Sequence, residues 1–242
     1  MHETRMDAAA PDAKTGLPPQ IVFVHLPKTG GFALHAALER GLPAGSVLRI
    51  GDSTAQAAFR SMRPADVARY RLVSGHFTFE EALALAPPGA RFATLLRDPV
   101  ARLLSAFNYM STWTEHPLHD SFRNRGFAEF IADSGRELAA EACRQLTGRS
   151  TAAEAIPVLE SCYGLVGTTE RLTDVSLHLH RWLDLPPQAP GRENVTAGQG
   201  RITLTCETCE QLLDLTREDR ALYRHIADRH AGLMLHSAYA AA

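Results

Sequence analysis

Short runs of apolar and β-branched residues recur along the chain, and each is followed by a loop or by residues with helical spacing. The runs are Ile21–His25, Val47–Ile50, Arg71–Ser74, Arg91–Leu96 and Tyr163–Gly167. Buried strands that alternate with helices are typical of parallel sheets with crossover connections. The pattern therefore predicts an α/β fold, a single domain with a central, mostly parallel sheet flanked by helices.

The spacing between these runs predicts the helices. One helix is predicted from about Thr29 to Arg40, because Gly41 and then Pro43 supply stop signals. Further helices that cover the sheet are predicted over residues 126–160, and others over 169–185 and 206–231.

The helix that begins after Asp98 is the most strongly marked. Asp98 suits the N-cap and Pro99 suits the first helical position. One apolar face follows, formed by Val100, Leu103, Leu104 and Phe107. We expect this helix to follow directly from the strand Arg91–Leu96.

The remaining segments set the domain limits. Residues 1–19 show no strand or helix pattern and are predicted to be a flexible tail, which leaves residues 20–242 as one domain. With 242 residues, of which 45% are hydrophobic, the chain is long enough to bury a substantial core. The Pro- and Gly-rich stretch Pro186–Arg201 is the longest predicted loop, and loops of that length are often functional.

Composition narrows the possible partners. The formal net charge is −2, so no global positive field favours nucleic acid or an anionic membrane surface. No apolar run approaches the ~20 residues of a membrane span, and the N-terminal residues lack the apolar segment of a signal peptide. We expect a cytoplasmic protein without a membrane span.

Cysteines and histidines give little sign of a metal site. The four cysteines are too sparse for a disulfide scaffold, and Cys206-Glu-Thr-Cys209 is a CxxC without a second pair. Reduced, structural thiols are expected. Four histidines in helical patterns, which lack a metal-ligand signature, are interpreted as surface or packing residues: His178, His180, His225 and His230.

The first predicted strand leads into a loop with the chemistry of an anion site. The loop reads His25-Leu26-Pro27-Lys28-Thr29-Gly30-Gly31 and is followed by a helix. Glycines allow backbone amides to approach an anion, the helix start presents unpaired N–H groups, and Lys28 adds a point charge. A phosphate or sulfate group is the expected ligand.

This loop differs from the ATP-binding P-loop, since Lys28-Thr29 precedes Gly30-Gly31. It resembles the 5′-phosphosulfate loop of sulfotransferases that use 3′-phosphoadenosine-5′-phosphosulfate (PAPS), in the family that includes heparan sulfate 2-O-sulfotransferase and its bacterial relatives. The resemblance implies a P-loop-like three-layer domain. It also implies that PAPS is bound by Pro27, Lys28, Thr29, Gly30, Gly31 and Phe32. In that family Thr or Ser commonly follows Gly-Gly, whereas this chain has Phe32, which donates no hydroxyl hydrogen bond.

The segment Thr94–Phe107 is similar to the same family's 3′-phosphate site. Arg97 directly follows a predicted strand, and its planar guanidinium presents several N–H donors. Ser105 lies two turns into the helix, away from its apolar face. The resemblance implies that both hold the 3′-phosphate. Arg201, in the loop after Gly198-Gln199-Gly200, is a further candidate contact to the nucleotide.

A third motif, Ser74-Gly75-His76-Phe77, stands at another strand end. A Gly-His at this place carries the catalytic base in the heparan-type enzymes, so the resemblance implies that role for His76. An imidazole with a pKa near 6.5 is largely neutral at physiological pH and accepts a hydroxyl proton. His25 is the alternative base, although we assign it to holding the loop.

The expected reaction is direct in-line transfer of the sulfuryl group from PAPS to a hydroxyl, which leaves PAP, the 3′,5′-bisphosphate of adenosine. His76 removes the proton, Lys28 and the loop amides stabilise the leaving group, and no metal is required. The acceptor is a hydroxyl-bearing carbohydrate, lipopolysaccharide or small natural product. It is expected to enter between the His76 loop and the segment Trp113–Arg125.

Two alternatives remain open at this point. A nucleotide or adenylylsulfate kinase would use the Lys28 loop for ATP phosphates with magnesium, although no clear magnesium-binding carboxylate follows a strand. A non-catalytic relative would keep the nucleotide pocket without turnover, and the function of His76 distinguishes it from an enzyme.

Overall fold

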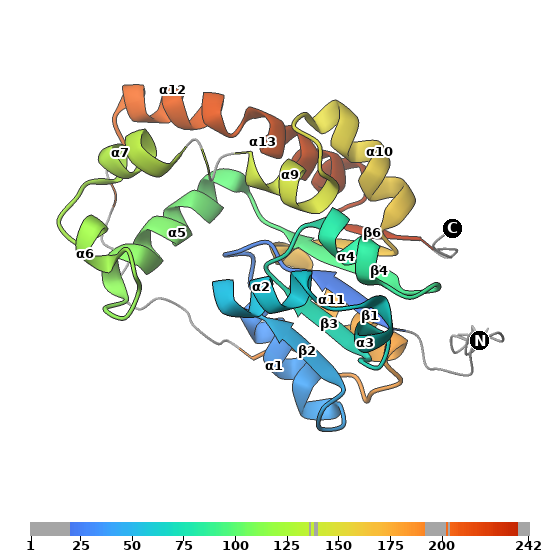
Figure 1. Cartoon of the computed structure of the whole chain (residues 1–242). Helices are drawn as coiled ribbons and strands as arrows, with labels where there is room; N and C mark the ends of the chain where they lie inside the picture. Colours follow the sequence, from blue (N-terminus) through green and yellow to red (C-terminus); the bar gives the residue numbers. More distant parts are fainter. Residues whose placement is uncertain (1–19, 136, 138–139, 192–201, 203, 237–242) are drawn as a thin grey trace.

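The fold is built around one twisted sheet (Figure 1). The computed structural model describes residues 20–135, 137, 140–191, 202 and 204–236. Over these residues the sheet has six strands in the order β2-β3-β1-β4-β5-β6, and all pair in parallel except β6, which is antiparallel to β5. The strands are β1 (Ile21–Val24), β2 (Val47–Ile50), β3 (Leu72–Gly75), β4 (Arg91–Leu96), β5 (Leu165–Thr168) and β6 (Leu233–Leu235). The predicted fold class is confirmed.

The five strands predicted from sequence are present, with ends that shift by at most two residues. The strand β6 was not predicted, because an edge strand of three residues carries too little of the alternating pattern. It follows the predicted terminal helices and pairs its Leu233–Leu235 with Leu165–Gly167 of β5.

Strand alternation divides the core between the two faces of the sheet. Ile21 and Phe23 of β1 pack with the helices α1 (Gly31–Gly41) and α11 (Leu172–Trp182) on one face. Val22 and Val24 belong to a larger cluster on the opposite face. That face is covered by α2 (Ser53–Arg60), α3 (Pro64–Val67), α4 (Phe79–Leu85), α9 (Glu141–Thr147), α10 (Ala152–Cys162) and α13 (Arg217–Arg224).

A separate group of helices extends beyond the sheet and has its own core, which includes Leu103, Phe107 and Phe130. Its members are α5 (Pro99–Thr112), α6 (His119–Phe122), α7 (Phe127–Phe130), the π-helical turn η1 (Ile131–Gly135) and α12 (Cys206–Leu215). The expectation that all helices between residues 126 and 160 cover the sheet was therefore wrong for α7 and η1. Phe127 and Phe130 of α7 and Ile131 of η1 pack in the cluster of Leu103 and Phe107 of α5. Figure 1 shows α7 beside α5, away from the strands.

The predicted start of α5 is confirmed. The Asp98 carboxylate accepts a hydrogen bond from the Ala101 N–H at 2.8 Å, and Pro99 opens the helix. Leu103 and Phe107 are buried in the core of this helix group. The cap fixes the direction in which α5 leaves the sheet edge.

The strand order brings three loops together. β1 lies between β3 and β4, so the chain crosses to the opposite side of β1 as it passes from β3 to β4. In open parallel sheets, ligands bind beyond the carboxyl ends of the strands at such a reversal of order. His25, His76 and Arg97 follow β1, β3 and β4 at this edge.

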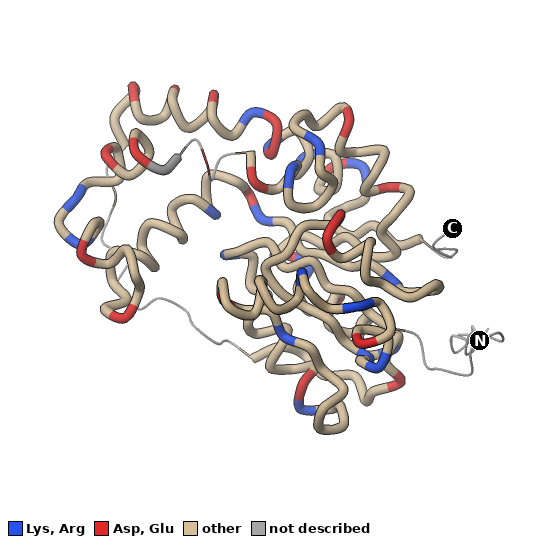
Figure 2. The backbone as a smooth tube through the Cα atoms, in the orientation of Figure 1, with Lys and Arg blue, Asp and Glu red and all other residues tan. Residues whose placement is uncertain are grey.

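Acidic and basic positions are interspersed over the fold (Figure 2), in agreement with the small net charge. Among the residues that the structure describes, no helix combines the length and apolar content needed to cross a membrane. The predicted tail, residues 1–19, and most of the predicted loop Pro186–Arg201 lie outside the described residues.

A buried ion pair joins the sheet edge to the helical layer. Arg102 of α5, only 2% exposed, donates to Glu141 at 2.7 Å and lies 3.8 Å from Asp219 of α13. Asp219 also accepts hydrogen bonds from the N–H groups of Ala142 and Cys143, in the first turn of α9. One carboxylate therefore connects α5, α9 and α13.

We predict that Asp219→Ala lowers the free energy of unfolding by about 2–4 kcal/mol, because two buried N–H groups and part of the Arg102 charge lose their partner. Urea denaturation followed by circular dichroism measures this. Asp214→Ala, which removes an exposed pair with Arg217, is the matched control and should cost less than about 1 kcal/mol. Equal losses for the two variants would contradict the assignment.

Candidate functional site

The loop between β1 and α1 has the backbone conformation of an anion cradle. Lys28 has a φ of 67° and Gly30 a φ of 88°, so two left-handed residues lie in one tight turn. This conformation is uncommon for a residue with a side chain and costs about 1–3 kcal/mol. The buried Thr29 hydroxyl donates to the Leu26 carbonyl at 2.8 Å and holds the turn closed. Alternating conformations of this kind turn successive N–H groups toward one concave surface.

The carbonyl groups of this loop are directed into the protein. The Lys28 carbonyl accepts from Arg97 Nη1 at 3.0 Å, and the Thr29 carbonyl accepts from the Thr169 hydroxyl at 3.1 Å. In a trans peptide the following N–H points the opposite way. The N–H groups of Thr29 and Gly30 therefore point away from Arg97 and Thr169, toward the outer side of the loop.

The first turn of α1 completes the cradle. No side chain of the described residues caps this helix, and its first turn contains no acidic residue. The positive end of the helix dipole is thus available to an anion. Gly31 is required here for close packing, because a Cβ atom at this position would lie 2.2 Å from Nε2 of His25.

Lys28 is held beside an aromatic ring of α5. Its ammonium lies 3.8 Å from the centroid of the Tyr109 ring. Partial burial, together with the nearby charge of Arg97, lowers the pKa of Lys28 to about 8. The residue is therefore charged below about pH 8 and becomes neutral above it, so an anion is bound best in the lower range.

Arg97 contacts the loop, and Ser105 lies on the helix that follows Arg97. Arg97 is partly buried, and its hydrogen bond to Lys28 links the two predicted phosphate motifs directly. Ser105 stands one helical turn before Tyr109, on the stripe of α5 that contacts Lys28. The structure thus brings these residues to one side of the sheet edge.

His76 has a defined tautomer. Its Nδ1 lies 3.0 Å from the carbonyl oxygen of His25, which is an acceptor only, so Nδ1 carries the proton. Nε2 of the neutral ring is then the acceptor nitrogen. Gln145 of α9 donates to the same carbonyl at 3.0 Å and to the Phe77 carbonyl at 3.2 Å. It thus links the residue after His76 to the carbonyl that His76 contacts.

Burial keeps three neighbouring imidazoles neutral. The rings of His25 and His76 are stacked with centroids 4.6 Å apart, and His35 lies 6.1 Å from His25. Burial lowers the pKa of His25 well below its usual value, with a further contribution from His76. It also lowers the pKa of His35 to about 4, and the Ser74 hydroxyl is the hydrogen-bond partner of that ring. The pKa of His76 is lowered mainly by burial, against which its hydrogen bond to His25 acts.

His76 and Pro27 line the same cavity, which has a volume of about 520 Å³. Pro27 directly precedes Lys28, so this cavity connects the candidate base with the anion loop. Phe77 and Thr78 continue the lining after His76. The remaining lining side chains are polar and come from α2, α4 and α9, namely Gln56, Arg60, Glu81, Glu141, Arg144 and Gln145. The segment Trp113–Arg125, which we expected to border the acceptor, lines no part of this cavity. Its Trp113 stacks on Tyr109 instead, with ring centroids 4.9 Å apart.

Several predicted site residues have less direct positions. Phe32 lies in the first turn of α1 and is 46% exposed, and the Arg49 guanidinium lies 5.0 Å from its ring centroid. Arg201 lies outside the described residues. All four cysteines are free, and Cys206 and Cys209 lie in the first turn of α12.

Sequence reasoning missed three residues that shape the site: Tyr109, Gln145 and Thr169. Tyr109 could have been found from its spacing of four residues after Ser105. Gln145 and Thr169 are brought to the loop by contacts over more than a hundred residues, for which the sequence pattern gives no signal.

No family model and no curated protein matches the chain. Among solved structures, the fold is similar to the crystal structure of a sulfotransferase from Alicyclobacillus acidocaldarius, with a TM-score of 0.50 and 15% identity, over 87% of this chain and 96% of that chain. The chain shares the fold of this solved structure. Mouse sulfotransferase SULT7A1, complexed with PAP, matches with a TM-score of 0.48 and 14% identity, over 84% of this chain and 85% of that chain.

We predict that Lys28 titrates near pH 8. The sequence contains two lysines, Lys14 and Lys28, so NMR of protein with isotope-labelled lysine gives two signals, and loss of one in Lys28→Arg identifies it. Arg97→Gln should raise this midpoint because it removes a nearby positive charge. Two signals that both titrate near the usual value of about 10.4 would show that Lys28 is solvated, and the proposed cradle would be wrong.

Proposed function

We propose that this protein is a PAPS-dependent sulfotransferase that transfers a sulfuryl group to a hydroxyl of an acceptor molecule. The observation that carries the proposal is the cavity shared by Pro27, next to Lys28, and His76. This cavity supports the proposal, because the candidate base lines it together with a residue of the loop that is expected to hold the leaving group. The finer resemblance to the family of heparan sulfate 2-O-sulfotransferase is part of this proposal.

In the proposed complex, the 5′-phosphosulfate of PAPS binds to the cradle. The N–H groups of Thr29, Gly30, Gly31 and Phe32 and the ammonium of Lys28 contact its oxygens. Arg97 and Ser105, with Arg201, bind the 3′-phosphate. The orientation of the loop supports this division, because the N–H groups of Thr29 and Gly30 point away from Arg97 and so serve a different anionic group.

The proposed transfer is a single in-line displacement. Nε2 of His76 takes the proton from the acceptor hydroxyl, the acceptor oxygen forms a bond to sulfur, and the bond from sulfur to the 5′-phosphate oxygen breaks. The electron pair leaves with PAP, where Lys28 and the loop amides stabilise it. The hydrogen bond from Nδ1 to the His25 carbonyl keeps Nε2 unprotonated and fixes the ring for this step.

The cavity supports a polar acceptor. Arg60 and Glu81 form an ion pair at 2.5 Å, and Glu141 and Arg144 add one charge of each sign. Side chains that donate and accept hydrogen bonds recognise several hydroxyl groups at once. A hydroxyl-rich carbohydrate, the sugar portion of a lipopolysaccharide or a polar small natural product matches this lining.

The kinase alternative is less well supported. Its magnesium ion requires a free carboxylate near the phosphates, and Asp98 is the carboxylate that follows β4 at this edge. The Asp98 side chain is occupied as the N-cap of α5, where it accepts from the Ala101 N–H.

A screen of hydroxyl-bearing acceptors with radiolabelled PAPS tests the function directly. We expect transfer of label to at least one polar acceptor, with release of PAP and without added metal. Calorimetry with PAP and with ATP provides the second measurement. Tight binding of ATP with magnesium, together with weak binding of PAP, would favour the kinase, whereas PAP binding without transfer to any acceptor would favour the non-catalytic relative.

We predict that Arg97→Gln binds PAP about 10–100-fold more weakly, since a charge-assisted contact to the 3′-phosphate is worth about 1.5–3 kcal/mol. Affinity for 5′-AMP should change little, because 5′-AMP has no 3′-phosphate. Calorimetry with both nucleotides measures the difference, and Arg217→Ala, an exposed arginine of α13, is the control. Equal losses for PAP and 5′-AMP would place Arg97 in the scaffold only.

We predict that His76→Ala binds PAP normally but loses about 10²–10⁴-fold in kcat, the usual contribution of a general base. In the unmodified protein, kcat/KM should decrease as the pH drops below the usual imidazole pKa of about 6.5, since burial lowers the pKa of His76. It should also decrease above about pH 8, where Lys28 loses its proton. His76→Ala should lack the acidic limb. His236→Ala is the control, because the His236 N–H donates to the Gly164 carbonyl just before β5, at the opposite end of the strand from the site. Unchanged turnover in His76→Ala would transfer the role to another group.

A further inference from the structure

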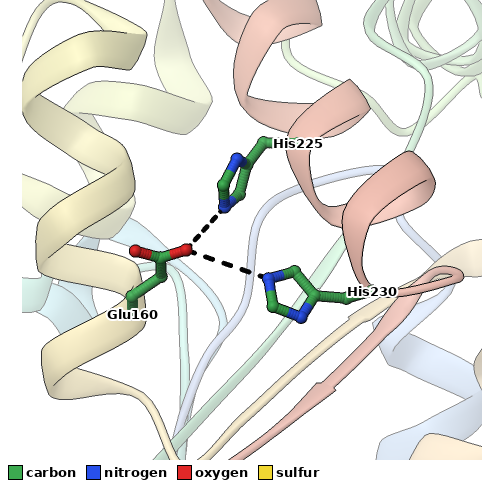
Figure 3. Close-up of side chains that lie close together, drawn as sticks. All are labelled: Glu160, His225 and His230. Atoms are coloured by element: carbon green, nitrogen blue, oxygen red, sulfur yellow. Dashed lines mark hydrogen bonds and ion pairs between the residues drawn. The ribbon is translucent and has the colours of Figure 1, made fainter.

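Three side chains from the helical layer converge outside the candidate active site. Glu160 lies near the end of α10, His225 begins the π-helical turn η3 (His225–Arg229), and His230 directly follows it (Figure 3). Nε2 of His225 lies 2.7 Å from Oε1 of Glu160, and Nε2 of His230 lies 3.8 Å from the same oxygen. None of the three lines the cavity beside His76.

The π-helical turn explains why the two histidines meet. On a regular α-helix, residues five positions apart point about 140° away from each other. In η3 the wider turn brings the rings of His225 and His230 to the same side, with centroids 5.5 Å apart. Such turns are rare and are frequently found at functional sites. This conformation also explains why the sequence spacing of these histidines shows no recognisable ligand motif.

The donor set and its dimensions suit a transition metal ion. One ligand atom from each residue can be chosen so that all lie within 4.8 Å of one another. Four ligands at the usual zinc distances are separated by about 3.3 Å, a value between the two separations from Glu160. Two imidazoles and a carboxylate bind zinc and its neighbours in the first transition row, whereas calcium and magnesium require more oxygen ligands.

The exposure of the three side chains allows an ion to enter. The side chain of His225 is 10% exposed, that of His230 30% and that of Glu160 41%, so the cluster is anchored on one side and open on the other. The hydrogen bond to Glu160 already orients the His225 ring. Water completes the coordination from the open side.

We propose that Glu160, His225 and His230 form a binding site for a zinc-type divalent ion, with a water molecule as the fourth ligand. The ion connects the end of α10, which leads into β5, with η3, which leads into β6. It therefore fastens the antiparallel edge strand to the rest of the sheet. This site is structural and is separate from the proposed sulfuryl transfer.

Cobalt(II) provides the direct test on the full chain after removal of metal by a chelator. We expect one equivalent to bind in the micromolar range with the visible absorption of a four- or five-coordinate nitrogen and oxygen site, and zinc to displace it. Zinc should also raise the Tm by several degrees, since it binds the folded state. Neither measurement uses PAPS, so the result is independent of the proposed enzymatic function.

Two variants and one control make the assignment specific. Glu160→Gln keeps a hydrogen-bond acceptor for His225 but loses the charge, and His230→Ala removes the more exposed imidazole, so both should fold and bind cobalt at least tenfold more weakly. His178→Ala, on α11, should bind as the unmodified protein does. Absence of binding up to about 100 μM would overturn the proposal. Binding of cobalt by Glu160→Gln and His230→Ala as tightly as by the unmodified protein would overturn it as well. A thiolate-to-cobalt charge-transfer band would assign the ion to Cys206 and Cys209 instead and would overturn it too.

Discussion

The carbonyl oxygen of His25 is the acceptor on which the arrangement of the candidate site depends. It accepts from Nδ1 of His76, which follows β3, and from Gln145 of α9, so one backbone oxygen joins the central strand, its neighbour and the helical layer. This oxygen is available because β1 ends at Val24 and the chain then turns into the loop. A side-chain acceptor in its place would be free to move or to titrate, whereas a backbone carbonyl does neither. The tautomer of His76 is therefore fixed by the fold.

Burial has two different effects on the charges at this edge. It holds the imidazoles of His25 and His35 neutral, so they serve as packing for the loop and not as competing cations. It leaves Lys28 close to its titration point, because the Tyr109 ring stabilises the ammonium less completely than water does. An anion that enters the cradle would supply the missing counter-charge. A chain with almost balanced charge can in this way present a local site for a multiply charged ligand.

The sequence predicted the parts of the fold that rest on local rules. The apolar runs that end at Val24, Gly75 and Leu96 are buried strands, and the Asp98 cap with Pro99 marks the start of α5. Because the carboxyl ends of parallel strands meet at one edge of the sheet, the common edge of the three motifs could be predicted. Contacts between distant segments gave no such signal. Gln145 reaches His25 only because α9 packs across the sheet, and the meeting of His225 with His230 depends on a π-helical turn that no spacing rule predicts.

The two sides of the candidate site have different structural origins, and this division bears on specificity. The anion cradle and His76 stand on loops that leave adjacent strands of the sheet, so their relative positions are fixed by the strand register. The remaining wall of the cavity comes from side chains of α2, α4 and α9, which rest on the sheet through apolar contacts such as those of Phe59, Ala82 and Leu146. Exposed polar side chains on such helices, among them Arg60, contribute little to the core and can be exchanged at small cost in stability. In the proposed function, the groups that bind the donor are therefore held by the sheet, while those that would recognise the acceptor belong to the helices. A related chain with the same loops and a different cavity wall would be expected to transfer the same group to a different hydroxyl.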